Sequence, residues 1–256
     1  MRGNEKVAFT AEAVAFMRAS KNVDKFSKYF VSKETEKKFN FFGKIVPKSY
    51  FDRVFVKRIG LSRELDKLMR GYKPEQIVEL ACGYSPRGLV LTRRSSKLVY
   101  VETDFSSVIE RKRAILKKNG IELKKNHHLV AIDSVKDDLS KKLGRFFDRK
   151  KKTLVVAETL TMYLNDEEHE FLVENIKKFL ESFKNSAYLS HEGKRMLKRF
   201  FGKLLLFYRN VVEKTKSHRH FRDAGKIKSY FLGRGFRKVL VRENEEISQI
   251  FYLVEN

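Results

Sequence analysis

Acidic residues and a glycine turn follow two apolar stretches in the first half of the chain. One stretch, residues 77–81, leads into a turn that contains Gly83 and Gly88. About twenty residues later, a second stretch over 97–104 ends in Glu102 and Asp104. A glycine turn lets a ligand approach the backbone closely, and an acid at the end of the next strand suits the hydroxyls of a ribose. The spacing therefore predicts a site for a nucleotide-like ligand.

The composition of the turn indicates which kind of nucleotide fits. Residues 81–88, ACGYSPRG, do not follow the G-x-G-x-x-G pattern, because Ala81, Tyr84 and Ser85 take places where glycine or a small residue is expected. The turn has no Walker lysine either, so a phosphate cradle is not indicated. S-adenosylmethionine, an adenosine-bearing cofactor without a pyrophosphate, fits better. A βα turn that binds nothing is the alternative interpretation of this local pattern.

An alternation of strand and helix patterns positions these residues. Helix-like stretches separate most of the strand-like stretches, which predicts a mostly parallel, doubly wound α/β sheet. Gly120 is the expected end of one of these helices, and Asn165 is the expected N-cap of another. A short acidic link over 243–246 joins the last two strands as a hairpin, so that the last strand runs antiparallel, as in Rossmann-like class I methyltransferases. The seven expected strands are 76–82, 97–103, 127–133, 152–159, 187–192, 237–243 and 248–255.

Helical patterns precede the sheet. Residues 10–20 predict a helix with Thr10 as its N-cap, residues 21–38 a short second helix, and residues 48–71 a longer helix that Gly71 closes. We expect residues 1–73 to form an N-terminal helical cap and residues 74–256 the cofactor-binding core, within a single compact domain.

A longer segment separates the fifth and sixth strands. Residues 193–235 are basic and aromatic together. They predict an amphipathic helix that packs on the sheet, and also a helical lid insertion over the carboxyl ends of the strands, where ligands bind in such folds.

Composition limits where the protein works. The 256 residues include one cysteine, Cys82, which excludes an internal disulfide framework and favours a reducing compartment. No apolar run approaches the roughly 20 residues of a membrane span. Glu5 and Glu12 lie where a secretory leader would be apolar. We therefore expect a soluble cytoplasmic protein with no membrane association.

The net charge of +24 permits two interpretations. A basic surface attracts nucleic acid or other polyanions. The lysines are spread over the whole chain and alternate with glutamates, however, which is typical of a solvated surface. The solvated surface is favoured, and nucleic acid remains the alternative partner. No pattern in the sequence assigns an oligomeric state.

Several motifs occur together in a recognisable order. The segments ELACGYSPRGL, YVETDFSSVIERKRAIL, AIDSVKDDL and VVAETLTMYLNDEEHEFLVENI resemble the leucine carboxyl methyltransferase family, including bacterial relatives assigned to polyketide O-methylation. TAEAVAFMRAS resembles that family's N-terminal segment. The resemblance covers roughly residues 10–192, and joint order is more specific than any single motif. It implies a class I fold with S-adenosylmethionine as methyl donor.

The resemblance also implies a set of cofactor-binding residues. Arg18 matches the arginine that reaches the cofactor's methionine carboxylate, and Glu158 matches the glutamate beside the methionine moiety. Asp104 matches the ribose acid, with Glu102 as the competing choice. The other matches are Glu79, Cys82 and Gly83 as the floor of the site, Asp133 and Ser134 on the adenine side, and Arg87 as a residue of the loop. The alternative for Arg18 and Arg87 is an ion pair at a helix end.

The function expected from these residues is transfer of a methyl group to a carboxylate or hydroxyl of a small molecule or peptide end. A carboxylate is already ionised at neutral pH and needs only cations to aim it. Candidates among the basic residues of the lid are Arg195, Arg199 and Arg209. A hydroxyl needs a base, for which His191 is the candidate, and Tyr163 lies just beyond Glu158.

Two other functions remain open at this point. The net charge suggests an RNA or ribosome methyltransferase, although the segment after the fourth strand, ETLTM, is not an N-P-P-Y-like motif. The other hypothesis is a non-catalytic protein that binds S-adenosylmethionine. The HRH tract at 218–220 has no partners of metal-site spacing, so no metal is expected.

Overall fold

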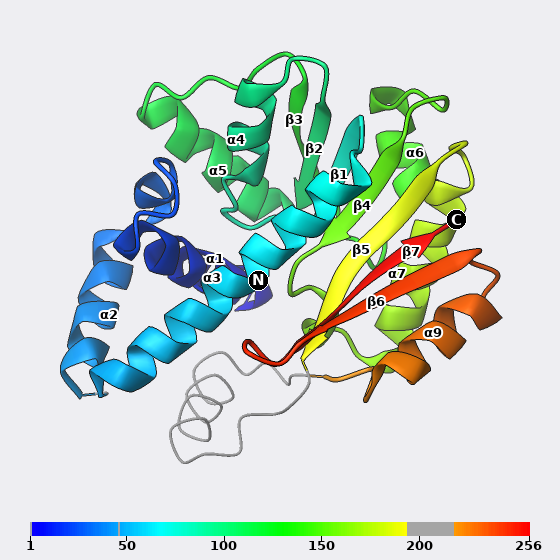
Figure 1. Ribbon diagram of the computed structural model, residues 1–256. Helices are drawn as coiled ribbons and strands as arrows, with labels where there is room; N and C mark the ends of the chain where they lie inside the picture. Colours follow the sequence, from blue (N-terminus) through cyan, green and yellow to red (C-terminus); the bar gives the residue numbers. More distant parts are fainter. Residues whose placement is uncertain (1, 46, 194–217) are drawn as a thin grey trace. The chain divides into compact units, whose positions relative to one another are not determined.

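The computed structural model describes residues 2–45, 47–193 and 218–256. The chain divides into two compact units, Met1–Asp133 and Ser134–Asn256, and each is described here by itself (Figure 1). The seven strands form a mixed, mostly parallel sheet, in the order β3-β2-β1 within the first unit and β4-β5-β7-β6 within the second. The predicted α/β fold with seven strands and an antiparallel last strand is confirmed.

In the first unit, four helical segments precede three parallel strands. All five residues of β1 are buried, which fits a near-continuous apolar strand covered on both faces. Val78 pairs with Val101, and Glu102 pairs with Leu129. The elements are α1 (Arg2–Ser20), η1 (Ser27–Phe30), α2 (Lys33–Ile45), α3 (Lys48–Tyr72), β1 (Gln76–Leu80), α4 (Arg87–Arg94), β2 (Val99–Asp104), α5 (Ser106–Lys118) and β3 (His127–Ala131).

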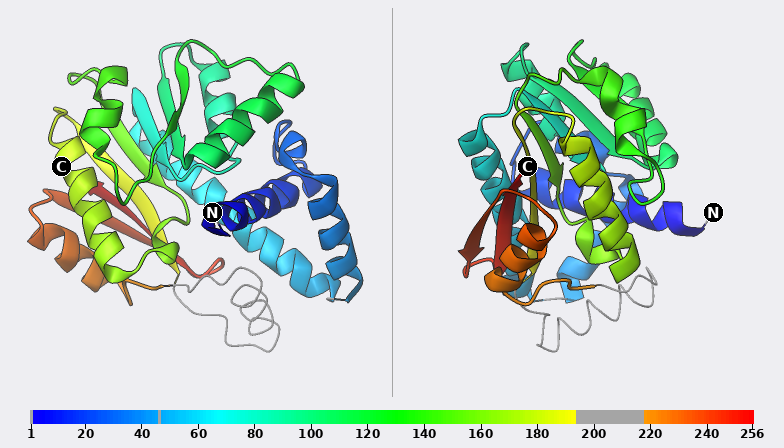
Figure 2. Two further views of the ribbon diagram at one scale, coloured as in Figure 1. Left: turned by 180° about the vertical axis from the view of Figure 1, so that it is seen from behind. Right: turned by 90° about the vertical axis from the view of Figure 1, so that its right-hand side faces the viewer.

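In the second unit, β4 and β5 are parallel, and β7 lies antiparallel between β5 and β6. Helices α7 and α9 pack side by side, joined by the ring contact of His169 with Tyr230 and the ion pair of Arg234 with Glu170 (Figure 2). The elements are α6 (Leu139–Leu143), η2 (Gly144–Phe146), β4 (Thr153–Ala157), η3 (Thr161–Tyr163), α7 (Asp166–Leu180), β5 (Ser186–Gly193), α9 (Ala224–Gly233), β6 (Lys238–Asn244) and β7 (Gln249–Glu255).

The N-terminal helices differ from the expectation. Helix α1 begins at Arg2, so Thr10 lies inside it and is not its N-cap. The reason is that no residue between positions 4 and 9 breaks a helix, so the pattern extends upstream of the threonine. Helix α3 ends one residue beyond Gly71, and Lys73 takes the left-handed conformation that ends it.

Two helix ends follow their sequence signals closely. Asn165 caps α7 through a reciprocal capping box with Glu168. Gly120, with φ of +63°, follows the end of α5, and the backbone N–H of Ile121 returns to the carbonyl of Leu116. These bonds satisfy the last carbonyls of the helix.

The expected lid segment is described only in part. Residues 194–217 lie outside the described residues, whereas 218–235 include α9. Within the described part of the chain, no helix combines the length and apolarity needed to cross a membrane.

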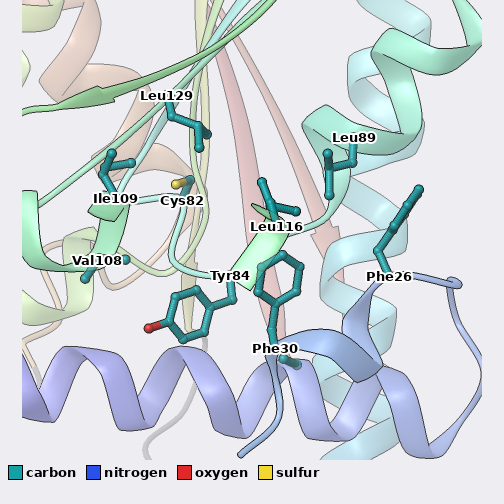
Figure 3. Close-up of a cluster of buried hydrophobic side chains, with 10 residues drawn as sticks. Phe26, Phe30, Cys82, Tyr84, Leu89, Val108, Ile109, Leu116 and Leu129 are labelled. Carbon is teal, nitrogen blue, oxygen red and sulfur yellow. The ribbon is translucent and has the colours of Figure 1, made fainter. Parts of the chain in front are cut away.

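The loop after β1 rests on a buried apolar cluster of the first unit (Figure 3). The ring of Tyr84 stacks on that of Phe30, with centroids 5.5 Å apart and planes 9° from parallel. Offset stacking of this kind adds to the stabilisation from burial. The cluster thus holds the loop between η1 and the strand ends. Its members include Phe26, Phe30, Cys82, Tyr84, Leu89, Val108, Ile109, Leu116 and Leu129.

Candidate functional site

A carboxylate is held in place where β2 ends. The backbone N–H of Gly83 donates to Oδ2 of Asp104 at 2.7 Å, and the N–H of Phe105 donates to Oδ1 at 2.8 Å. Asp104 is buried, and burial raises the pKa of its carboxyl group although both backbone bonds oppose that shift. Each oxygen retains a lone pair beyond its backbone bond, so a fixed carboxylate here can accept hydrogen bonds from neighbouring hydroxyls.

The loop that supplies this N–H contains two left-handed residues. Gly83 has φ of +51°, and a Cβ there would lie 3.1 Å from the Cβ of Ala11. Ala81 also has positive φ, +50°, although it carries a Cβ. Non-glycine residues adopt this region rarely and at a cost in free energy, and such outliers concentrate at ligand sites. The loop therefore keeps a glycine-like shape at both positions.

The neighbouring acid, Glu102, has a different set of partners. It is fully buried and forms an ion pair with Lys112, and Nε2 of His127 lies 3.0 Å from its Oε1. The Lys112 ammonium also donates to the carbonyl of Ser85 at 2.7 Å. Burial alone would raise the pKa of Glu102, but Lys112 and His127 outweigh it and lower that pKa. These contacts occupy the carboxylate of Glu102 inside the first unit, which favours Asp104 as the ribose acid.

Packing within the first unit explains why residue 88 is a glycine. It lies in the first turn of α4, and a Cβ there would lie 2.6 Å from Nε2 of His127 and closer still to Glu102. The sequence suggested that this glycine lets a ligand approach. In the structure it lets α4 approach the Glu102–His127 pair on β2 and β3.

Glu79 is likewise paired internally. Its carboxylate forms an ion pair with Arg87 and accepts a hydrogen bond from the Tyr100 hydroxyl at 2.8 Å. Arg87 also donates to Asp66 of α3 at 2.6 Å. Burial raises the pKa of Glu79, and the Arg87 guanidinium opposes that rise. Arg87 therefore braces β1, α3 and α4, as the structural alternative for this residue proposed.

The thiol of Cys82 is buried beneath the loop. Its backbone N–H donates to the carbonyl of Thr103 at 2.9 Å, which joins the ends of β1 and β2. Burial raises the pKa of the thiol well above its usual value, so Cys82 is not a reactive thiolate. It serves the site as a small apolar residue.

Arg18 and Glu12 order the turn after α1. Nε of Arg18 lies 3.0 Å from Oδ2 of Asp24, which is the helix-end ion pair considered for this arginine. Glu12, which the sequence analysis used only as a charge in the N-terminal segment, is buried and accepts from the Thr35 hydroxyl at 2.7 Å and from Arg111.

Lys112 and His127 were missed entirely. Sequence contained a signal for Lys112: it lies within a helical stripe whose other members, Val108, Ile109 and Leu116, are apolar and buried. A lysine in such a stripe requires a buried carboxylate partner. His127 offered no comparable signal.

The second unit holds its candidates at the ends of β4 and β5. Glu158 and Tyr163 are both half-buried. Thr159, the residue after Glu158, has φ of +69°, and its N–H donates to Nε2 of His191 at 3.0 Å. Nδ1 of His191 lies 2.9 Å from Oε1 of Gln249. The Nε2 lone pair is thus engaged, so His191 would have to give up the Thr159 bond to take a proton.

The remaining candidates are placed less informatively. Asp133 is half-buried at the end of the first unit, and Ser134 is buried at the start of the second. Arg195, Arg199 and Arg209 lie outside the described residues.

Glu192, at the end of β5, is a titratable group that the sequence analysis did not single out. It is 3% exposed, and its Oε2 has no hydrogen-bond partner among residues 2–45, 47–193 and 218–256. Burial raises its pKa to about 7, against the opposing effect of Arg219 and of the backbone N–H groups of His220 and Gly193. The sequence did contain a signal for this residue, because Glu192 is an acid at the end of an apolar strand.

The HRH tract packs back on the second unit. Nε2 of His220 lies 2.9 Å from the carbonyl oxygen of Thr161, and its ring stacks on that of His169 with centroids 4.0 Å apart. Among residues 2–45, 47–193 and 218–256, no group of three or more His, Cys, Asp or Glu side chains is arranged to hold a metal ion.

The seven-stranded sheet, with β7 antiparallel between β5 and β6, has the strand arrangement expected of class I methyltransferases. The family model for leucine carboxyl methyltransferase matches residues 11–177, which is most of the chain. The chain therefore belongs to the leucine carboxyl methyltransferase family. No curated protein matches the sequence.

Solved structures share the fold at low identity. A protein from Nostoc punctiforme assigned as an O-methyltransferase has a TM-score of 0.55 at 12% identity, over 80% of this chain and 60% of that one. Magnesium protoporphyrin IX methyltransferase from Synechocystis, with bound SAH, has 0.51 at 10%, over 82% and 95%. An O-methyltransferase family protein from Burkholderia thailandensis has 0.53 at 12%, over 94% and 68%. These likenesses show the fold alone.

Proposed function

We propose that this protein is an S-adenosylmethionine-dependent O-methyltransferase that acts on a carboxylate of a small molecule or peptide end. The observation that carries the proposal is the family match over residues 11–177, a family described as transferring methyl groups to a carboxyl. The solved relative with bound SAH supports the same cofactor.

The residues at the end of β2 suit such a cofactor. Asp104 is fixed by two backbone N–H groups and can accept hydrogen bonds from ribose hydroxyls. The turn that contains Gly83 lacks a phosphate-binding pattern, which agrees with a nucleoside that carries no phosphate. When bound, S-adenosylmethionine supplies an electrophilic methyl group. The chain's own part is to bind, orient and desolvate the reactants, because an in-line displacement depends mainly on positioning.

A carboxylate acceptor fits the histidine geometry. A carboxylate is already ionised at neutral pH and needs no general base. His191, the histidine considered as a base, accepts from the Thr159 amide through Nε2. We propose Arg195, Arg199 and Arg209 as the cations that orient the acceptor carboxylate.

A hydroxyl acceptor is the second candidate, and Glu192 is the observation that favours it. A carboxyl group with a pKa of about 7 is suited to take a proton near neutral pH. Within the part of the chain that the structure describes, its Oε2 has no hydrogen-bond partner, which leaves its lone pairs for an acceptor hydroxyl.

The two candidates give chemically different products. The protein would be incubated with S-adenosylmethionine labelled in the methyl group and a panel of small carboxylic acids, free peptide ends, phenols and RNA. Methyl esters release labelled methanol in mild alkali, whereas methyl ethers do not. Alkali-labile label that depends on the protein is expected, and Asp104→Asn should abolish it.

Alkali-stable label would instead favour the hydroxyl candidate, in which case Glu192→Gln should abolish the activity. Label transferred only to RNA would contradict both.

A further inference from the structure

The residue after Glu158 has a backbone conformation that needs support. Thr159, with φ of +69°, lies in the left-handed region that β-branched residues rarely adopt. Its conformation costs free energy and persists only where the surrounding structure holds it, which is typical of functional sites.

The support comes from the neighbouring strand. β4 pairs with β5 in parallel, with Val156 opposite Leu189, so His191 reaches the residue just beyond the end of β4. Its Nε2 accepts the Thr159 amide N–H at 3.0 Å; His191 is 6% exposed and Thr159 is half-buried. The bond is therefore partly shielded from water, and losing it leaves an amide N–H without its acceptor.

A third strand fixes the state of the imidazole. An amide N–H can only donate, so Nε2 of His191 carries no proton, and the proton of the neutral ring is on Nδ1. That N–H donates to Oε1 of Gln249 at 2.9 Å, from the first residue of β7. The donors thus run in one direction, from Thr159 through His191 to Gln249.

We propose that His191 is a positioning residue for the cofactor. With Gln249 it holds Thr159 left-handed and so sets the direction in which the chain presents Glu158 at the carboxyl end of β4. The inference rests on the proposed function, because ligands of open α/β sheets bind at the carboxyl ends of the strands. His191 then acts through the backbone of Thr159 and not by proton transfer.

Calorimetric titration with S-adenosylhomocysteine tests this without an acceptor. His191→Phe keeps a flat ring and removes both nitrogens, and we expect it to weaken binding about tenfold, as for the loss of one partly buried hydrogen bond. His191→Gln keeps an acceptor near the place of Nε2 and should bind nearly as the unaltered protein does.

A second-site change separates positioning from other roles. Thr159→Gly permits positive φ without a brace, so the double variant with His191→Phe should regain most of the affinity. Thr159→Ala with His191→Phe is the matched control. It also removes the threonine side chain but keeps the strain, and it should remain weak.

Each outcome has one meaning. Equal affinity of the unaltered protein and His191→Phe would overturn the inference, as would equal affinities of the two double variants. If the unaltered protein does not bind, the proposed cofactor is wrong. In that case nitrogen NMR of the imidazole still tests the geometry, because an Nε2–H tautomer would overturn it.

If His191→Phe does not fold, as judged by circular dichroism and thermal unfolding, Gln249→Leu replaces it. This change leaves the Thr159 contact in place but removes the acceptor that selects the Nδ1–H tautomer. It should weaken binding by a smaller factor, and unchanged affinity would count against the proposal.

Discussion

Two carboxylates on one strand illustrate how neighbours divide roles at the scale of single residues. Glu102 and Asp104 are two positions apart on β2 and therefore point to the same face. Lys112 forms an ion pair with Glu102 within the core, and Nε2 of His127 lies 3.0 Å from its Oε1. Asp104 is held at the strand end by hydrogen bonds from the backbone N–H groups of Gly83 and Phe105. The first arrangement builds the loop, and the second leaves oxygen lone pairs for a ligand.

Removing the cation of the buried pair should be costly. Lys112→Met leaves Glu102 buried without its charge partner, which typically costs about 3–5 kcal/mol of unfolding free energy. Adding Glu102→Gln removes the stranded charge, so the double variant should recover much of this loss. Urea unfolding of the two single variants and the double variant measures the coupling. Additive losses would contradict the pairing.

Glu192 should make stability depend on pH. Its pKa is raised from 4.5 to about 7, so the folded protein holds the proton more tightly than the unfolded chain does. The stabilisation of the folded state by protonated Glu192 is complete below about pH 4.5 and is lost as the pH rises through 7. The Glu192→Gln side chain cannot ionise. Its free energy of unfolding, relative to that of the unaltered protein, should therefore rise by about 2–3 kcal/mol from pH 5 to pH 8. Unfolding of both proteins at the two pH values measures this, and a constant difference would contradict the raised pKa.

At the scale of elements, the close packing of helix α4 on β2 and β3 requires a residue without a Cβ at position 88. Gly88→Ala would place a Cβ against Glu102 and His127, and overpacking of this kind costs about 1–3 kcal/mol or more. Gly71→Ala, in α3, meets nothing within 4 Å and should be neutral or stabilising by about 0.5–1 kcal/mol. Thermal unfolding of both variants makes the comparison, and equal effects would show that α4 can move away from β2.

Most of the elements could be predicted from the sequence, because their signals are local. The alternation of apolar runs identified all seven strands, and Asn165 and Gly120 marked helix ends through their own chemistry. The start of α1 was not predictable in this way, because Thr10 is compatible with both a cap and a helix interior.

The candidate site was predictable only in part. The strand ends drew attention to Asp104 and Glu102, but choosing between them required knowing where Lys112 and His127 lie, which depends on packing across three elements. The hydrogen bond at Nδ1 of His191 is made with Gln249, which is 58 residues away. No local pattern contains such a contact.

At the scale of the whole molecule, the charge of +24 should produce weak and non-specific affinity for polyanions. Each phosphate contact releases counterions, so we expect retention on RNA to fall steeply between low and moderate salt, with no preference among sequences. Filter binding across a salt series measures this. Tight binding that persists at high salt would favour the RNA methyltransferase alternative.

The measurement that tests the central claim most directly is calorimetric titration of the full chain with S-adenosylmethionine and S-adenosylhomocysteine. Micromolar binding is expected, lost in Asp104→Asn and retained in Glu122→Gln, an exposed acid of the same unit. Absence of binding at millimolar ligand, or equal binding in Asp104→Asn, would contradict the cofactor site proposed for this protein.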